Sequence, residues 1–235
     1  MVERPRVHRA GGRGGPPDRA PGRRAPGRRD APHALGADNA IVDATLDLPA
    51  SGDEASGQNL DKYAGTSASG KLTASDILAL ETVEATDPSY TRARALLLMD
   101  AERKKNAPAT RQYLDQIMAV PENRYNPIYL TENARYYVNQ GQYELALRDA
   151  RKAEQYWARL PSDLVFAKKA EIYEIQAAAA QGLFYRSGDD VQLLEQAITG
   201  WERYRDHVAT RGRTDLSARA DKELAKLEDF RARLQ

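Results

Sequence analysis

The chain of 235 residues contains no cysteine, which excludes disulfide bonds, thiolate metal sites and cysteine nucleophiles. Histidine is scarce as well. Of the three histidines, His8 and His33 lie in an Arg- and Pro-rich segment, and His207 follows Asp206 near the end of an amphipathic stretch. No two of them stand at the spacing of metal ligands on one element, so the sequence gives no indication of a zinc site.

Long apolar runs are also missing. No run approaches the roughly 18–20 apolar residues that a membrane-spanning helix needs. No apolar core follows the Arg pairs of the N-terminus, so no signal peptide is indicated. Without a membrane span, a signal peptide or a cysteine for lipidation, we expect a cytoplasmic protein.

The sequence also lacks a recognisable arrangement of catalytic groups. Acidic residues are many, but most alternate with Lys or Arg at helical spacing, as in Glu144 and Arg148 or Glu223 and Lys226. Such pairs are typical of solvated ion pairs on helix surfaces rather than of acid–base pairs. We therefore predict that the protein is not an enzyme and that it has no catalytic residue, cofactor or metal.

Charge is small in total but unevenly placed. The net charge of +1 argues against a protein that binds nucleic acid through its whole surface. Residues 1–30 nevertheless carry nine Arg against three acidic residues, a net of +6, whereas residues 31–70 carry six acidic residues against Lys62, a net of −5. Residues 1–36 have almost no large apolar side chains, so they are predicted to be disordered. We expect an Arg/Gly/Pro-rich tail and polar linker over residues 1–70, and a folded domain over residues 71–235.

The stretch from Leu130 to Trp157 predicts two antiparallel helices joined by a turn at Gly141-Gln142. A left-handed helix cap at Gly141 costs glycine little. Alanines spaced four and three apart form a stripe of small side chains on the second helix, which lets two helices approach closely. The small and aromatic positions of the hairpin are Ala134, Tyr137, Gly141, Tyr143, Ala146, Ala150 and Ala153.

The hairpin resembles the tetratricopeptide repeat, whose pattern places small residues, a Gly and aromatic residues in this register. It departs at Leu130, where the family often has Trp, at Ala150, where it often has an aromatic residue, and at Pro161, which comes late. Helices over 89–104 and 108–119 are similar to a degenerate first copy, and helices over 163–186 and 191–209 to a third. Helices over 74–86 and 214–234 would cap the ends. Thr73 with Asp76 predicts a capping box at the start of the first of these, and residues 121–127 are expected to form an extended connector. The expected fold is all-α, a tetratricopeptide-like helical-hairpin α-solenoid of about three repeats plus capping helices.

The resemblance implies a protein–protein interaction module, that is, an adaptor, assembly or regulatory scaffold. In the family, a peptide segment or helix of another protein lies in a concave groove that the first helices line. Carried onto the hairpin, the groove positions are Thr131, Arg135 and Asn139, where Arg135 would pair with a carboxylate and Asn139 would hold peptide backbone. The corresponding predictions for the first and third copies are Arg94 and Tyr185.

Two alternatives stay open. In one, the protein is associated with nucleic acid through its Arg-rich tail, where residues 11–15 form an RGG-like fragment. In the other, the helices are an appendage of a larger signalling system. The sequence does not indicate the oligomeric state.

Overall fold

A computed structural model of the protein describes residues 59–234, and in this range the chain is helical without any strand. The all-α prediction is thus confirmed for the described residues, whereas the predicted disordered tail, residues 1–36, lies outside them. No helix in this range combines the length and the apolar character that a membrane crossing requires. The elements in chain order are η3 (Asp61–Tyr63), α2 (Ala64–Ala68), α3 (Ala74–Glu81), α4 (Tyr90–Arg103), α5 (Ala107–Ala119), η4 (Pro121–Tyr125), α6 (Pro127–Asn139), α7 (Tyr143–Gln155), η5 (Trp157–Arg159), α8 (Val165–Ser187), α9 (Val191–Ala209) and α10 (Thr214–Leu234).

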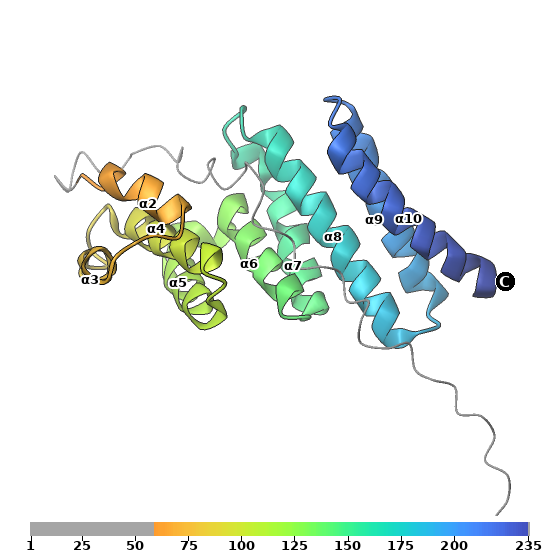
Figure 1. The fold of residues 1–235 in the computed structure, drawn as a ribbon, viewed down its shortest axis with the longest axis horizontal. Coiled ribbons are helices and arrows are strands. Elements are labelled where there is room, and N and C mark those ends of the chain that lie inside the picture. The colour runs from red at the N-terminus through yellow and green to blue at the C-terminus, as the bar shows by residue number, and fades with distance from the viewer. Residues whose placement is uncertain (1–58, 235) are drawn as a thin grey trace, which may run out of the picture. The chain divides into compact units, whose positions relative to one another are not determined.

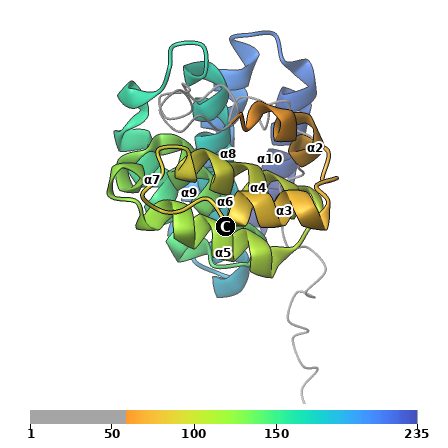
Figure 2. The same ribbon diagram turned by 90° about the vertical axis from the view of Figure 1, so that its left-hand side faces the viewer.

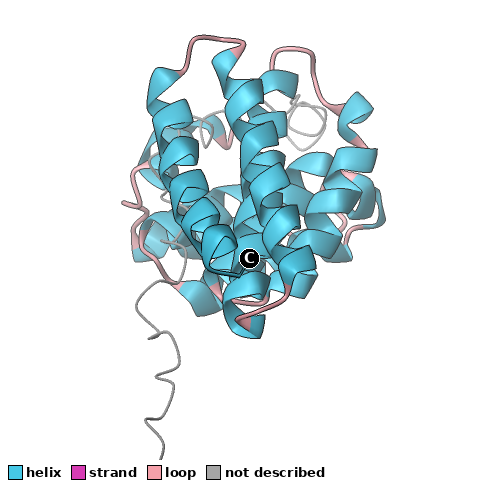
Figure 3. Cartoon of the chain, turned by 90° about the vertical axis from the view of Figure 1, so that its right-hand side faces the viewer, coloured by secondary structure: helices cyan, strands magenta, loops and turns pink. Residues whose placement is uncertain are grey.

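The long helices pack as consecutive pairs. Helix α4 packs against α5, α6 against α7, and α8 against α9, while α7 and α8 join the second pair to the third. Helix α10 packs on α9. The pairs follow one another in chain order, from the yellow α4 to the blue α10 (Figure 1). Figure 2 shows the side formed by α2 to α5, and Figure 3 shows the opposite side, where the C-terminal end of α10 is marked.

The core consists of two groups of buried apolar side chains. One group extends from Leu60 to Tyr129 and includes Leu160 and Leu164. The other extends from Leu130 to Leu227. The partly buried side chains of Met118 and Trp157 pack against both groups, so they connect the first helix pair to the later ones.

The folded part begins earlier than the sequence predicts. Residues 61–68, which were expected to be linker, form η3 and α2, and α2 packs against α4. The side chains of Leu60 and Leu72 are buried, and the buried hydroxyl of Ser67 donates to the carbonyl of Leu96. Tyr63 and Ala64 pack against the same core, so these contacts together dock a short segment whose composition is typical of a loop.

Most helix boundaries agree with the predicted ones, and the exceptions have local causes. The predicted capping box of α3 is present, because Thr73 accepts from the backbone N–H of Asp76 and Asp76 from that of Thr73. Helix α3 nevertheless ends at Glu81 rather than at residue 86, since Arg94 takes up the carbonyls of Leu80, Glu81 and Val83. Hydrogen bonds to a charged donor are strong, so these three compete with the backbone hydrogen bonds that would continue the helix.

The other two exceptions lie at helix starts. The connector over residues 121–127 is not extended: residues 121–125 form η4, and Pro127 begins α6, where its fixed φ suits the first turn. Helix α8 begins at Val165 rather than at residue 163, and no side chain caps it. Leu160 and Leu164 are both buried, so apolar packing rather than a polar cap fixes the N-terminal end of α8.

The hairpin of α6 and α7 has the predicted turn and the predicted packing. Gly141 has φ +68°, the left-handed conformation expected of a cap. Ala134, Ala146, Ala150 and Ala153 are each 0% exposed, so the small stripe lies against neighbouring helices. Gly182 of α8 also allows close packing between helices, because the ring of Tyr143 lies directly over it.

This close approach predicts that Gly182→Ala lowers the free energy of unfolding by about 2 kcal/mol, through overpacking. A Cβ at position 182 would lie 2.3 Å from Cζ of Tyr143, whose buried ring has to move. The control is Gly65→Ala in α2, where no heavy atom lies within 4 Å of the new Cβ. We expect that change to be neutral or stabilising by about 0.5 kcal/mol. Equal effects of the two substitutions in chemical denaturation would contradict the argument.

Candidate functional site

The structure gives the predicted contact residues on α6 three different surroundings. Thr131 is 0% exposed, and its hydroxyl donates to the carbonyl of Pro127 at 2.7 Å. Arg135 keeps 14% of its side chain exposed and forms ion pairs with Glu132 and Glu171. Asn139 is exposed at the end of the helix. Thr131 is therefore part of the packing, and Arg135 already has two carboxylate partners.

The predicted residues outside α6 also have partners. Arg94 on α4 is 6% exposed and donates to three carbonyls at the end of α3. Tyr185 on α8 is half-buried, accepts from the side-chain amide of Gln181 at 3.0 Å and packs against Phe230 of α10. The five predicted residues are spread over α4, α6 and α8, and their assignment to a partner surface remains a prediction.

A buried cluster of charged groups surrounds Arg135. Lys168 is 1% exposed, and its Nζ donates to Oε1 of Glu132 at 3.1 Å and to Oε2 of Glu171 at 3.0 Å. Arg135 donates to the same Oε2 of Glu171 at 2.6 Å and to Glu132. Burial would raise the pKa of Glu132, but Arg135 and Lys168 outweigh it and hold this pKa below its usual value. The cluster therefore joins α6 to α8 with ionised groups.

The cluster extends to helices on either side. Glu174 of α8 is buried and pairs with Arg219 of α10, and burial raises the pKa of Glu174 despite this partner. Glu102 of α4 faces the same charges: burial, and after it the carboxylate of Glu132, raises the pKa of Glu102 to about 8. Four carboxyl groups thus accompany the three cations Arg135, Lys168 and Arg219. The raised pKa favours the neutral form of Glu102, which would leave three carboxylates beside the three cations.

The raised pKa predicts a pH-dependent stability. Below pH 4.5 both states hold the Glu102 proton; between 4.5 and about 8 only the folded state keeps it, so stability falls with rising pH over this range. Glu102→Gln removes this dependence, so we expect the variant to gain about 1–2 kcal/mol over the wild type at pH 8.5 and to match it near pH 4.5. Because Glu102 is partly exposed, we expect this gain in stability to be smaller than the full pKa shift would give.

Urea denaturation of both proteins from pH 4.5 to 9 measures this effect. The control is Glu202→Gln, which removes the same charge from an exposed position on α9. We expect it to change stability by less than about 0.5 kcal/mol at every pH. If the difference in the free energy of unfolding between Glu102→Gln and the wild type does not grow with pH, the pKa of Glu102 is not raised in the folded protein.

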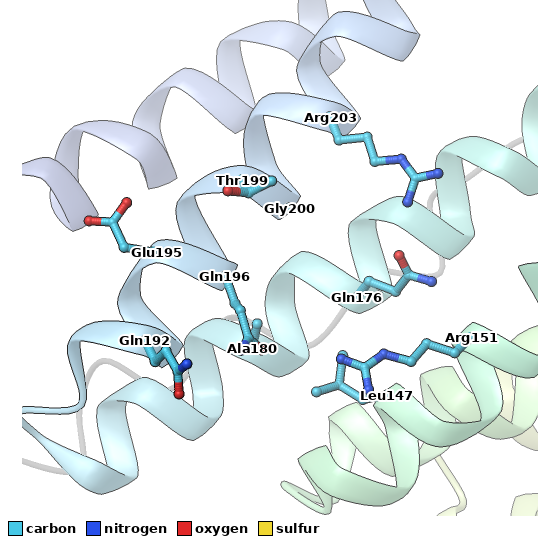
Figure 4. A pocket seen from close by; sticks show the side chains of 10 residues that line it. All are labelled: Leu147, Arg151, Gln176, Ala180, Gln192, Glu195, Gln196, Thr199, Gly200 and Arg203. Atoms are coloured by element: carbon cyan, nitrogen blue, oxygen red, sulfur yellow. The ribbon is translucent and has the colours of Figure 1, made fainter.

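A second candidate site is an open groove of about 390 Å³ between the second and third helix pairs. Its lining residues come from α7, α8 and α9 and are Leu147, Arg151, Gln176, Ala180, Gln192, Glu195, Gln196, Thr199, Gly200 and Arg203. Figure 4 shows Arg151, Gln176 and Arg203 toward one end of the groove and Gln192 at the other. The lining is mixed, with an apolar floor and amide or charged groups above it.

Close helix packing forms the floor of the groove. A Cβ at Gly200 would lie 2.9 Å from Cα of Ala177, so glycine lets α9 approach α8. Leu147 and Ala180 complete the floor. Underneath, Ala177, Ala197 and Ile198 are buried in the core, which makes the floor a rigid surface.

Hydrogen bonds close one end of the groove. Oε2 of Glu154 on α7 accepts from the amide of Gln176 on α8 at 2.8 Å, and Oε1 of the same residue pairs with Arg203 of α9. Arg203 also lies over the ring of Tyr173, with its guanidinium carbon 4.0 Å from the ring centroid. Three helices are thus held together at this end.

The remaining ionic residues of the groove differ in pairing. Glu195 accepts from Arg231 of α10 at 2.8 Å. Arg151 is exposed and has no ion pair within the described part of the chain. Glu154, one turn further along α7, accepts from Gln176 and Arg203 instead. Within residues 59–234, the groove therefore contains one cation, Arg151, that has no ion pair.

Among residues 59–234, no group of three or more His, Cys, Asp or Glu side chains is arranged so that it could hold a metal ion. Comparisons with protein-family models, with curated proteins and with solved structures found no significant match. The tetratricopeptide resemblance therefore remains a prediction that rests on the residues of the hairpin.

Proposed function

We propose that the helical unit is a protein–protein interaction module, an adaptor, assembly or regulatory scaffold with a tetratricopeptide-like series of hairpins. The single observation that carries this proposal is the open groove of about 390 Å³ between α7, α8 and α9. It combines an apolar floor with three glutamine amides, and each amide both donates and accepts hydrogen bonds. Such a lining suits the backbone and side chains of a peptide segment.

The groove supports this function better than the first-helix face does. On α6 the charge of Arg135 is taken up by Glu132 and Glu171, and Thr131 is buried. A partner carboxylate at Arg135 would have to displace a buried carboxylate that already has good geometry. Groove residues such as Gln192, Gln196 and Thr199 are exposed, so a partner reaches them without breaking the packing.

A rigid groove also limits the cost of binding. The floor lies over buried core residues, and the bonds of Glu154 tie the three helices together at one end. The protein then loses little conformational freedom when a partner binds, and the partner's own ordering is the main cost. This is the advantage of a helical scaffold over a flexible loop.

Peptide selection with blocked variants tests the proposal. Octapeptides displayed on phage are selected on the full chain, and the selected peptides are measured on Gln196→Trp, which fills the groove, and on Glu202→Trp, a matched change at an exposed position of α9 outside it. We expect binding to fall more than tenfold with Gln196→Trp only. If Gln196→Trp has no effect but Asn139→Trp abolishes binding, the first-helix face is the site and the groove proposal is wrong.

A further inference from the structure

We infer that the groove between α7, α8 and α9 takes an extended acidic segment, in which an Asp or Glu stands two residues from an aliphatic residue. This inference rests on the proposed function and names the partner class of the same site. It follows from the unmatched charge of Arg151, the spacing of the lining residues and the chemistry of the amides.

Charge complementarity selects an acidic partner. Among the ionic residues of the lining, Arg203 is paired with Glu154 and Glu195 with Arg231. Arg151 alone among them has no ion pair in the described part of the chain, and Glu154 on the same helix is engaged with Gln176 and Arg203. A carboxylate of the partner supplies the missing group, whereas a basic segment would add a second unpaired cation.

The amides select an extended backbone. On α9, residues 192, 196, 199 and 203 all line the groove at spacings of four, three and four, so they share one face. The rise between the first and last of them is about 16 Å, which matches about five residues of extended chain. The N–H and C=O groups of an extended segment are free to pair with Gln192 and Gln196, whereas those of a helix are used internally.

The spacing on α7 sets the order of side chains in the partner. Leu147 and Arg151 are four residues apart and both line the groove, which separates them by about 6 Å along the helix. Alternate residues of an extended chain point the same way and are about 6.6–6.8 Å apart. An aliphatic side chain over Leu147 therefore places the residue two positions away opposite Arg151.

Three pools of labelled hexapeptides test this inference on the full chain. Each pool contains Leu followed two positions later by Glu, by Gln or by Lys, with the other positions randomised. Affinity is measured by fluorescence polarisation, and occupancy of the groove by NMR shifts of the side-chain amides of Gln176, Gln192 and Gln196. We expect the Glu pool to bind about threefold to fivefold more tightly than the Gln pool, and the Lys pool to bind most weakly.

Variants separate the charge from the groove. Arg151→Gln should remove the preference for Glu over Gln, whereas Lys222→Gln, an equal charge change at an exposed position of α10, should keep the preference. If the Gln or Lys pool shifts the amides with equal or higher affinity, or if Arg151→Gln keeps the preference, the inference is wrong and the groove still binds peptide. If no pool shifts the amides at millimolar concentration, the proposed function itself fails.

Discussion

Replacement of Lys168 by Met is expected to lower the free energy of unfolding by about 3–5 kcal/mol, which is a large part of the stability of a domain of this size. Lys168 is 1% exposed, and its Nζ donates to Glu132 and Glu171, which are 4% and 2% exposed. Met fills a similar volume, so the loss comes mainly from charge. The substitution leaves Arg135 to serve two buried carboxylates, and the desolvation of these groups is then no longer offset.

A solvated pair with the same chemistry provides the control. Lys226 donates to Glu223 at the same i,i+3 spacing as Lys168 and Glu171, but 45% of the Lys226 side chain is exposed. We expect Lys226→Met to cost less than about 1 kcal/mol. In the double variant Lys168→Met with Glu132→Gln, one of the two carboxylates that share Arg135 is removed, so about 1–2 kcal/mol should return. Similar losses for the two lysines in urea titrations would show that burial does not govern this cluster.

The comparison of these two lysines shows what a sequence can predict here. Glu132 with Arg135, and Lys168 with Glu171, have the same i,i+3 spacing as Glu223 and Lys226. Local spacing indicates that such residues share a helix face, but not whether that face meets water or another helix. That outcome depends on how α6, α8 and α10 meet, so the buried cluster could not be predicted from the spacing.

Helices and turns were predicted more successfully because their causes are local. The capping box at Thr73, the left-handed Gly141 and the alanine stripe of α7 each depend on neighbours within a few residues. The early end of α3 was missed for the opposite reason, because Arg94 lies 11 to 14 residues away from the carbonyls that it binds. A bond of that range leaves no periodic trace in the sequence.

The groove does not follow from the resemblance, which places the partner surface on the first helices of the pairs. Its lining comes mainly from α7 and α9, the second helices of their pairs. The sequence nevertheless contains two weak signals of the groove. Gln192, Gln196, Thr199 and Arg203 form a polar face on α9, and a glycine, Gly200, stands in the middle of this helix. This polar face lines a groove because Gly200 lets α9 lie close to Ala177 of α8, and that contact cannot be read from the sequence.

Replacement of Arg94 by Met is expected to release α3, with a loss of about 2–4 kcal/mol that is confined to this part of the molecule. Arg94 donates to the carbonyl of Leu80 at 2.6 Å and to those of Glu81 and Val83 at 3.1 Å each. Without the guanidinium, the carbonyls of Leu80 and Val83 lose their charged donor in a buried environment, which favours detachment of the helix over an intact but unsatisfied end.

Hydrogen exchange distinguishes this local release from a general loss of stability. Amides of α3 should exchange about 30-fold faster or more in the variant, whereas those of α8 and α9 should change little. Arg94→Lys keeps the charge, but one ammonium group does not reach all three carbonyls, so an intermediate acceleration is expected. If α3 keeps its protection in Arg94→Met, then Arg94 does not hold this helix end, and its predicted role in binding a partner becomes the better explanation for its position.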